Sequence, residues 1–166
     1  MKKHSSFIGM LPGLAILAFF LAFSPSAWAG DALVVIVNNA NPVDNLSVGE
    51  LKKLFLSDRS KWDTGRSVAP VMITTGASER TAFLKIVCGM NDADFGKYFL
   101  QAAFTGKSAT PPKEVSSPQS VKSIVSNSPG AIGFVKASDL SSGDTTVKAV
   151  KIEGLAASDA GYKLHL

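Results

Sequence analysis

Short apolar runs along this chain are separated by longer segments whose apolar residues recur every three or four positions. A continuous apolar run predicts a buried strand, and a three-to-four residue recurrence predicts a helix with one buried face. The predicted strands lie at residues 33–37, 71–73, 131–135 and, with weaker alternation, 147–152. The predicted helices lie at residues 48–55, 78–88, 92–105 and 118–126. Strands that alternate with helices in this way indicate an α/β fold.

The first predicted helix has the clearest start signal in the chain. Ser47 and Glu50 have the spacing of a capping box, and Leu46 and Leu51 are placed to form the accompanying hydrophobic staple. The last predicted helix begins at Ser117 as its N-cap, with a proline at the first helical position. These signals predict where two of the helices begin.

The first 29 residues have the pattern of a secretory signal peptide. Two lysines precede an apolar run over residues 7–23, and Ala-Trp-Ala follows at residues 27–29 as a small-x-small cleavage pattern. A transmembrane anchor is the alternative, but a span needs about 20 apolar residues, and this run is shorter and contains a proline. We therefore expect cleavage after Ala29 and a single domain, residues 30–166, exported to the periplasm.

The charge of the chain gives no sign of a nucleic-acid partner. The formal net charge is +4 over the whole sequence, and two of the basic residues belong to the predicted signal peptide. The remaining lysines are scattered, and no aromatic residues interleave with them as a base-stacking surface requires. We therefore expect no nucleic-acid binding.

Reactive side chains are scarce in residues 30–166. His165 is the only histidine there, and Cys88 is the only cysteine of the whole chain, so neither an internal disulfide nor a zinc cluster is expected. No calcium loop, P-loop or dinucleotide fingerprint occurs. We expect a protein that is not an enzyme, without metal or cofactor, in which Cys88 is a buried thiol. A phosphate-ester hydrolase that uses carboxylates alone is the remote alternative.

Trp62 is the one large aromatic residue of a polar loop that spans residues 57–66. A tryptophan in such a loop predicts an anchor that buries its ring against the core. The alternative is a surface on which a ligand stacks.

Residues 70–88 predict a strand, a polar turn and a helix, with hydroxyl groups and an arginine collected where the helix begins. The first N–H groups of a helix have no intrahelical partner, and the helix dipole places partial positive charge there. Such a position favours phosphate, sulfate or a carboxylate. This turn is therefore the candidate anion site.

Short segments that occur in fixed order carry a family resemblance. The first group is Asn41-Pro42-Val43, Leu46-Ser47, Glu50-Leu51, Leu54-Phe55, Trp62, Gly65 and Pro70; the second is Phe104-Thr105-Gly106-Lys107, residues 121–126 and residues 128–135. In this order and spacing the chain resembles the phosphate-binding proteins of ABC importers over most of residues 33–138.

That resemblance implies a type II periplasmic-binding fold, in which two α/β lobes close on an oxyanion held by helix N-termini, hydroxyl groups and an arginine. The matched segments belong to the second lobe of that fold. We therefore expect an α/β fold made of a single three-layer lobe.

The candidate turn departs from the family pattern, which usually reads Ser-Gly-Thr and is often followed by arginine. This chain reads Ala77-Ser78-Glu79-Arg80-Thr81. In one register Ser78 takes the place of the family serine. In the other, Arg80 takes the place of the family arginine and Ala77 replaces the serine.

The expected ligand groups of this turn are four hydroxyls, one guanidinium and the N–H groups that follow a glycine. They belong to Thr74, Thr75, Ser78 and Thr81, to Arg80, and to Gly76. Glu79 would repel an arriving anion unless it points outward or pairs with Arg80. In the alternative interpretation Ser78 and Thr81 only cap the helix, and Arg80 pairs with Glu79 or faces solvent.

The resemblance implies a periplasmic substrate-binding protein for phosphate or a related oxyanion, with a membrane permease as its partner. A single lobe leaves its ligand half hydrated, so we expect weak affinity unless a homodimer or another partner covers the open face. The alternative is an interaction or sensor module of the cell envelope that has lost tight ligand binding.

Overall fold

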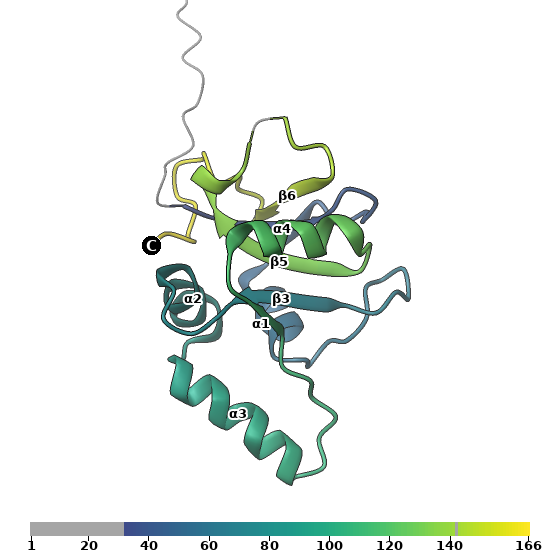
Figure 1. Ribbon diagram of the computed structural model, residues 1–166, viewed down its shortest axis with the longest axis vertical. Coiled ribbons are helices and arrows are strands. Elements are labelled where there is room, and N and C mark those ends of the chain that lie inside the picture. The colour runs from purple at the N-terminus through teal and green to yellow at the C-terminus, as the bar shows by residue number, and fades with distance from the viewer. Residues whose placement is uncertain (1–31, 142) are drawn as a thin grey trace, which may run out of the picture.

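A six-stranded mixed sheet forms the middle of the computed structural model, which describes residues 32–141 and 143–166 (Figure 1). The predicted signal peptide, residues 1–29, lies outside these residues. The strands follow the order β2-β6-β1-β5-β3-β4 across the sheet. They are β1 Leu33–Asn38, β2 Asn45–Leu46, β3 Ala69–Ile73, β4 Lys113–Val115, β5 Ala131–Lys136 and β6 Val147–Ile152.

β1 is buried along its whole length. Val35 pairs with Phe134 of β5 on one edge and with Val150 of β6 on the other, both in antiparallel register. β3 runs parallel to its two neighbours, β5 and β4. A strand with partners on both edges and cover on both faces has no side that meets water, which explains the continuous apolar run of β1.

Helix α4 covers one face of the sheet, and a glycine permits its close approach. The helices are α1 Val48–Phe55, α2 Ser78–Phe83, α3 Asp92–Phe104 and α4 Pro118–Asn127; α2 continues into a π-helix, η1 Leu84–Cys88, and a 3₁₀-helix, η2 Ala137–Asp139, follows β5. A Cβ atom at Gly133 of β5 would lie 2.5 Å from Cγ1 of Val121 in α4. Any other residue would therefore push α4 away from the sheet.

Helices α1 and α2 cover the opposite face. Phe134 follows Gly133 in β5, so its side chain points away from α4. It stacks on Phe83 of α2 with ring centroids 4.0 Å apart, and Phe55 of α1 lies 4.6 Å from Phe83. The expected arrangement of helix, sheet and helix layers is confirmed, and the chain has a mixed α/β fold.

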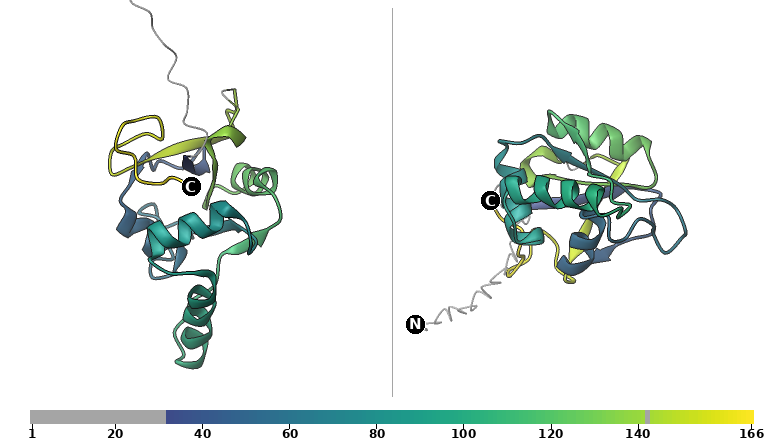
Figure 2. Two further views of the ribbon diagram at one scale, coloured as in Figure 1. Left: turned by 90° about the vertical axis from the view of Figure 1, so that its left-hand side faces the viewer. Right: turned by 90° about the horizontal axis from the view of Figure 1, so that it is seen from below.

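Helix α3 lies at one end of the molecule, away from the sheet (Figures 1 and 2). Phe95 and Phe99 are buried and pack edge to face, with centroids 5.1 Å apart. Its outer side carries Leu100 and Phe104, which are 58% and 83% exposed. One face of α3 is therefore packed, and the other presents large apolar groups to solvent.

The local start signals are confirmed. Ser47 and Glu50 form the capping box, and Ser117 caps α4 with Pro118 next to it. Neither the short strand β4, which follows a proline-rich connector, nor the π-helical turn that ends at Cys88 was predicted.

Among the described residues, no helix combines the length and the apolar character that crossing a membrane requires.

Candidate functional site

The predicted anion turn connects β3 to α2. The N–H of Thr74 donates to the carbonyl of Val115 in β4, 2.9 Å away, so the turn begins where the sheet pairing ends. Gly76 has a φ of 97°, a conformation that favours glycine, and the chain then enters α2 at Ser78. Five of the six predicted ligand residues are exposed there: Thr74, Thr75, Gly76, Ser78 and Thr81. The structure thus brings the predicted hydroxyl groups together at one exposed turn.

These hydroxyl groups do not cap the helix. The N-cap is Ala77, which has no side-chain cap, while Ser78 donates to the Glu79 carboxylate and Thr81 donates to the Ala77 carbonyl. The side chains of Thr74 and Thr75 make no hydrogen bond to any other residue of the described part. The alternative in which Ser78 and Thr81 only cap α2 is therefore wrong, because the N-cap residue is Ala77.

Arg80 is 4% exposed and lies beneath the turn. Its Nε pairs with Asp92, and its Nη1 donates to Glu114 at 2.7 Å. Nη1 also donates to the Ile73 carbonyl at 3.1 Å. The predicted alternative in which Arg80 pairs with Glu79 or faces solvent is wrong. Arg80 precedes Phe83 by three residues, so both side chains lie on the inward face of α2.

Glu79 occupies the start of the helix and is 8% exposed. Its carboxylate accepts from the Ser78 hydroxyl at 3.0 Å and lies 3.4 Å from Nζ of Lys136. Burial raises the pKa of Glu79, but hydrogen bonds from its own N–H and from Ser78, together with Lys136, outweigh burial and hold that pKa below its ordinary value. The side chain is therefore an anion at neutral pH, held at the position expected to attract one.

The ion-paired groups below and beside the turn carry a net negative balance, and the exposed Lys85, which lines a hollow with Ser78 and Thr81, brings the local charge to about neutral. Two basic groups, Arg80 and Lys136, are paired with three carboxylates, Asp92, Glu114 and Glu79. The balance among these five groups is one negative charge. A dianion that arrives at the turn therefore meets donors without a surplus of positive charge.

Asp92 and Glu114 are the functional residues that the sequence did not reveal. They lie 12 and 34 positions beyond Arg80. A capping role is the natural interpretation of Asp92, and Glu114 lies in the short strand β4 that the sequence did not predict. No local signal connects either carboxylate to Arg80.

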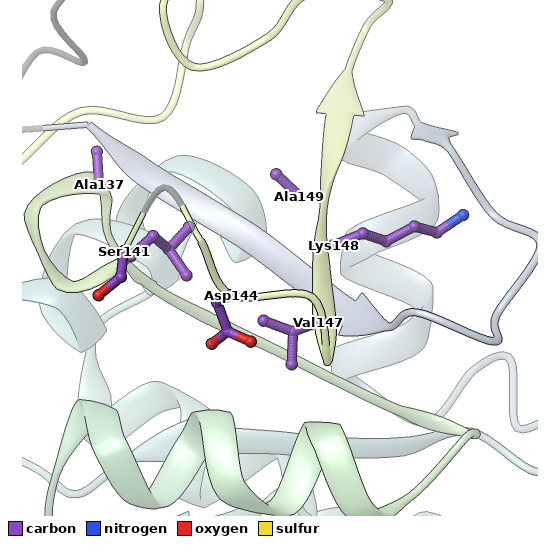
Figure 3. Close-up of a pocket in the computed structure, with 7 residues that line it drawn as sticks. Ala137, Ser141, Asp144, Val147, Lys148 and Ala149 are labelled. Atoms are coloured by element: carbon purple, nitrogen blue, oxygen red, sulfur yellow. The ribbon is translucent and has the colours of Figure 1, made fainter.

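A separate hollow lies between the end of β5 and the start of β6 (Figure 3). It is lined by Ala137, Leu140, Ser141, Asp144, Val147, Lys148 and Ala149. Asp144 accepts from the hydroxyl of Thr146, and Lys148 pairs with Asp44. None of the predicted ligand residues lines this hollow, and its charged groups are engaged elsewhere.

Two other sequence predictions concern buried side chains, and both are confirmed. Trp62 is buried, and its indole Nε1 donates to the Gly130 carbonyl at 2.9 Å, so it anchors its loop to the core. Cys88 is buried, and burial raises the pKa of its thiol to about 11. No cluster of histidine, cysteine and carboxylate side chains within residues 32–141 and 143–166 has the makings of a metal site.

Comparison with solved structures places the fold. A candidate phosphate ABC transporter substrate-binding protein from Clostridium perfringens, with bound phosphate, superposes with a TM-score of 0.62 at 23% identity, over 76% of this chain and 47% of that one. An ABC-type phosphate transport receptor from Vibrio cholerae gives 0.61 at 22% identity, over 76% and 48%. PstS from Borrelia burgdorferi gives 0.59 at 12% identity, over 76% and 49%. No protein-family model matches the chain.

The chain spans about half the length of these structures. At this level of identity the similarity establishes the fold: a mixed α/β lobe like those of the phosphate-binding proteins. These structural neighbours are described as binding or transport proteins, not as enzymes.

Proposed function

We propose that the chain is an exported, one-lobe, non-enzymatic protein that binds phosphate or a related oxyanion weakly at residues 74–81. The observation that carries this proposal is the exposed turn, in which Thr74 and Thr75 have no hydrogen-bond partner among the described side chains and backbone groups. Their hydroxyls are the donors we assign to the anion, together with those N–H groups after Gly76 that are not already bonded; the N–H groups of Ala77 and Glu79 are engaged with the Thr74 carbonyl and the Glu79 carboxylate. The fold shared with phosphate-binding proteins supports the assignment.

Arg80 has both a structural role and a ligand-binding role in this proposal. Its Nε and Nη1 are held by two carboxylates and one carbonyl, which fixes the turn against α3 and β4. Nη2 has no acceptor among the described residues, and we assign this nitrogen to the oxyanion. Because Glu79 remains ionised beside the same turn, the affinity of the lobe alone is expected to be in the millimolar range, as for solvated hydrogen bonds with no net charge attraction.

Isothermal titration of the purified protein with phosphate and with sulfate tests the proposal. The Thr74→Val/Thr75→Val variant removes the two hydroxyl groups and is expected to lose most of the heat of binding. Thr64→Val/Thr145→Val is the matched control, since it makes the same change at two exposed loop threonines away from the turn. Equal heats in both variants, or no heat with either anion at tens of millimolar, would reject the turn as the site.

A second candidate function is an interaction module, and the exposed side of α3 favours it. Leu100 and Phe104 are large apolar side chains at the end of the molecule, where a permease, another envelope protein or a second copy could dock. Sedimentation velocity tests the homodimer: wild-type protein should show a concentration-dependent dimer, and Phe104→Ser should remove it. A monomer at all concentrations would exclude self-association through this face.

A further inference from the structure

A cleft, separate from the hollow between β5 and β6, lies at the opposite end of β3 from the turn. It has a volume of about 550 Å³ and lies between the loop after α1, the residues that lead into β3, and the connector before β4. Its lining includes Arg59, Lys61 and Lys113. Three side chains are basic, five carry hydroxyl groups, and the rest are apolar. The lining contains no carboxylate.

The basic groups of this cleft keep a positive balance. Arg59 is paired with Asp63 at 2.6 Å and lies 3.8 Å from Glu50. Lys61 and Lys113 are exposed and form no ion pair with another residue of the described segments. The three basic side chains carry three positive charges, and the two carboxylates near Arg59, Asp63 and Glu50, carry two negative ones. The net charge of these five groups is therefore +1. An anion entering the cleft therefore meets a surplus of positive charge, unlike at the turn.

Several bonds hold the cleft walls in place. The Ser57 hydroxyl donates to the Thr110 carbonyl at 2.5 Å, which ties the loop after α1 to the connector before β4. Ser57 has a φ of 59°, an unusual value for a residue other than glycine. The N–H of Val68 donates to the Ser60 carbonyl at 2.9 Å, and Trp62 anchors the same loop to Gly130. The walls are thus fixed before any ligand arrives, which lowers the entropic cost of binding.

The volume and the lining of the cleft indicate which class of ligand it can bind. Its volume exceeds the roughly 300 Å³ at which pockets for small organic molecules begin, so the cleft has room for a carbon skeleton beside a phosphate group. The basic groups and hydroxyls suit a dianion, while Leu54, Pro70 and Pro111 offer apolar surface to a carbon skeleton. We infer that this cleft binds small phosphate monoesters, with Lys61 and Lys113 on the phosphate group. The inference does not depend on an anion site at residues 74–81.

The test uses glycerol 3-phosphate as the probe, with inorganic phosphate and glycerol as the two partial ligands, in isothermal titration of the purified protein. Lys61→Gln/Lys113→Gln removes both free charges of the cleft. Lys151→Gln/Lys163→Gln is the matched control, because it removes two exposed lysines that do not line the cleft. Without the two lysine–phosphate hydrogen bonds, which are partly solvated, the dissociation constant for glycerol 3-phosphate should rise about tenfold in the cleft variant. The control should stay within about twofold of wild type.

Two measurements distinguish binding at the cleft from anion binding at residues 74–81. The Thr74→Val/Thr75→Val variant should bind glycerol 3-phosphate as wild type does, and amide NMR shifts on titration should centre on Ser60, Ser67 and Ser108. Equal affinity in the cleft variant and its control would overturn the inference, as would a wild-type protein that does not bind the probe. Inorganic phosphate binding the cleft as tightly as the ester would overturn the assignment to monoesters.

Discussion

The two ends of strand β3 present similar chemical groups but differ in charge. At its C-terminal end, hydroxyls and Arg80 surround a turn, where the ion-paired basic groups are outnumbered by carboxylates and the nearby Lys85 leaves no positive surplus. At its N-terminal end, hydroxyls and three basic residues line a cleft that contains no carboxylate. An arginine beside a hydroxyl-rich helix start therefore does not by itself make a strong anion site. The carboxylates that reach it from elsewhere in the fold decide its charge.

Neighbouring residues of β4 contribute to both ends. Lys113 lines the cleft, while the next residue, Glu114, pairs with Arg80 beneath the turn. A strand of three residues thus supplies positive charge to one region and negative charge to the other. The contrast between the regions is therefore set over a short stretch of chain, and single substitutions can alter it.

The largest expected effect comes from removing Arg80. Arg80→Met leaves Asp92 and Glu114 close together without their shared cation, and the buried Ile73 carbonyl loses its donor. Because both carboxylates are partly exposed, we expect a loss of about 2–3 kcal/mol in the free energy of unfolding, less than the roughly 3–5 kcal/mol typical of breaking a fully buried ion pair. Urea denaturation at pH 7 measures it.

Arg66→Met is the control for that substitution, since Arg66 is exposed. It should unfold at nearly the wild-type urea midpoint. An Arg80→Met protein as stable as this control would mean that the guanidinium does not support the turn. Glycerol 3-phosphate binding should survive in any folded Arg80→Met protein, because the cleft does not use Arg80.

Neutralising Glu79 should strengthen the turn as an anion site. Glu79→Gln removes the carboxylate at the helix start and leaves Lys136 without its partner, so the local charge rises by one. We expect phosphate to bind about fivefold more tightly, roughly 1 kcal/mol, as a partly screened interaction between unit charges would give. Calorimetric titration with phosphate measures this affinity, with Asp159→Asn, at an exposed carboxylate of the C-terminal loop, as the control. Unchanged affinity would separate Glu79 from the anion site.

Neutralising a carboxylate beside the cleft should also raise anion affinity, but by less than at the turn. Asp63→Asn frees Arg59 from its exposed partner, and such surface pairs are worth about 0.2–1 kcal/mol. We expect about a twofold gain in glycerol 3-phosphate affinity, and a steeper loss of that affinity as salt is added. Asp159→Asn, at another exposed carboxylate, should have no effect. A gain of equal size in both variants would show only a change in overall charge.

The smallest expected effect is a change of stability with pH that originates at Glu79. The pKa of this carboxyl is held below its ordinary value, so its contribution to stability is present above that value and is lost as the pH falls through the lowered pKa. Thermal unfolding of wild type and Glu79→Gln should therefore differ at pH 7 and converge toward pH 3. A difference that stays constant between these pH values would argue against an ionised, stabilising Glu79.

Much of the fold could be predicted from the sequence because its signals are local. The capping box at Ser47 and Glu50, the Ser117 cap and the apolar run of β1 each act within a few residues, and each is confirmed. The three-layer lobe followed from the order of such elements and from the family resemblance.

The candidate site was harder to predict because its charge is set by distant residues. The sequence indicated which hydroxyl groups gather at residues 74–81, but pairing Arg80 with Asp92 and Glu114 requires the path of α3 and the position of β4. The cleft carries even less local signal, since its lysines lie 52 positions apart, at Lys61 and Lys113. Spatial clusters of this kind leave no periodic pattern in one sequence.

The burial of Trp62 also makes the protein its own spectroscopic reporter. The sequence has two tryptophans, Trp28 and Trp62, so a protein lacking residues 1–29 would contain a single emitting indole. That indole is packed in the loop that forms one wall of the cleft, with its N–H held by Gly130. Its emission should be blue-shifted in the folded state and should move to longer wavelength when the loop leaves the core, so folding of this region can be followed without any attached dye.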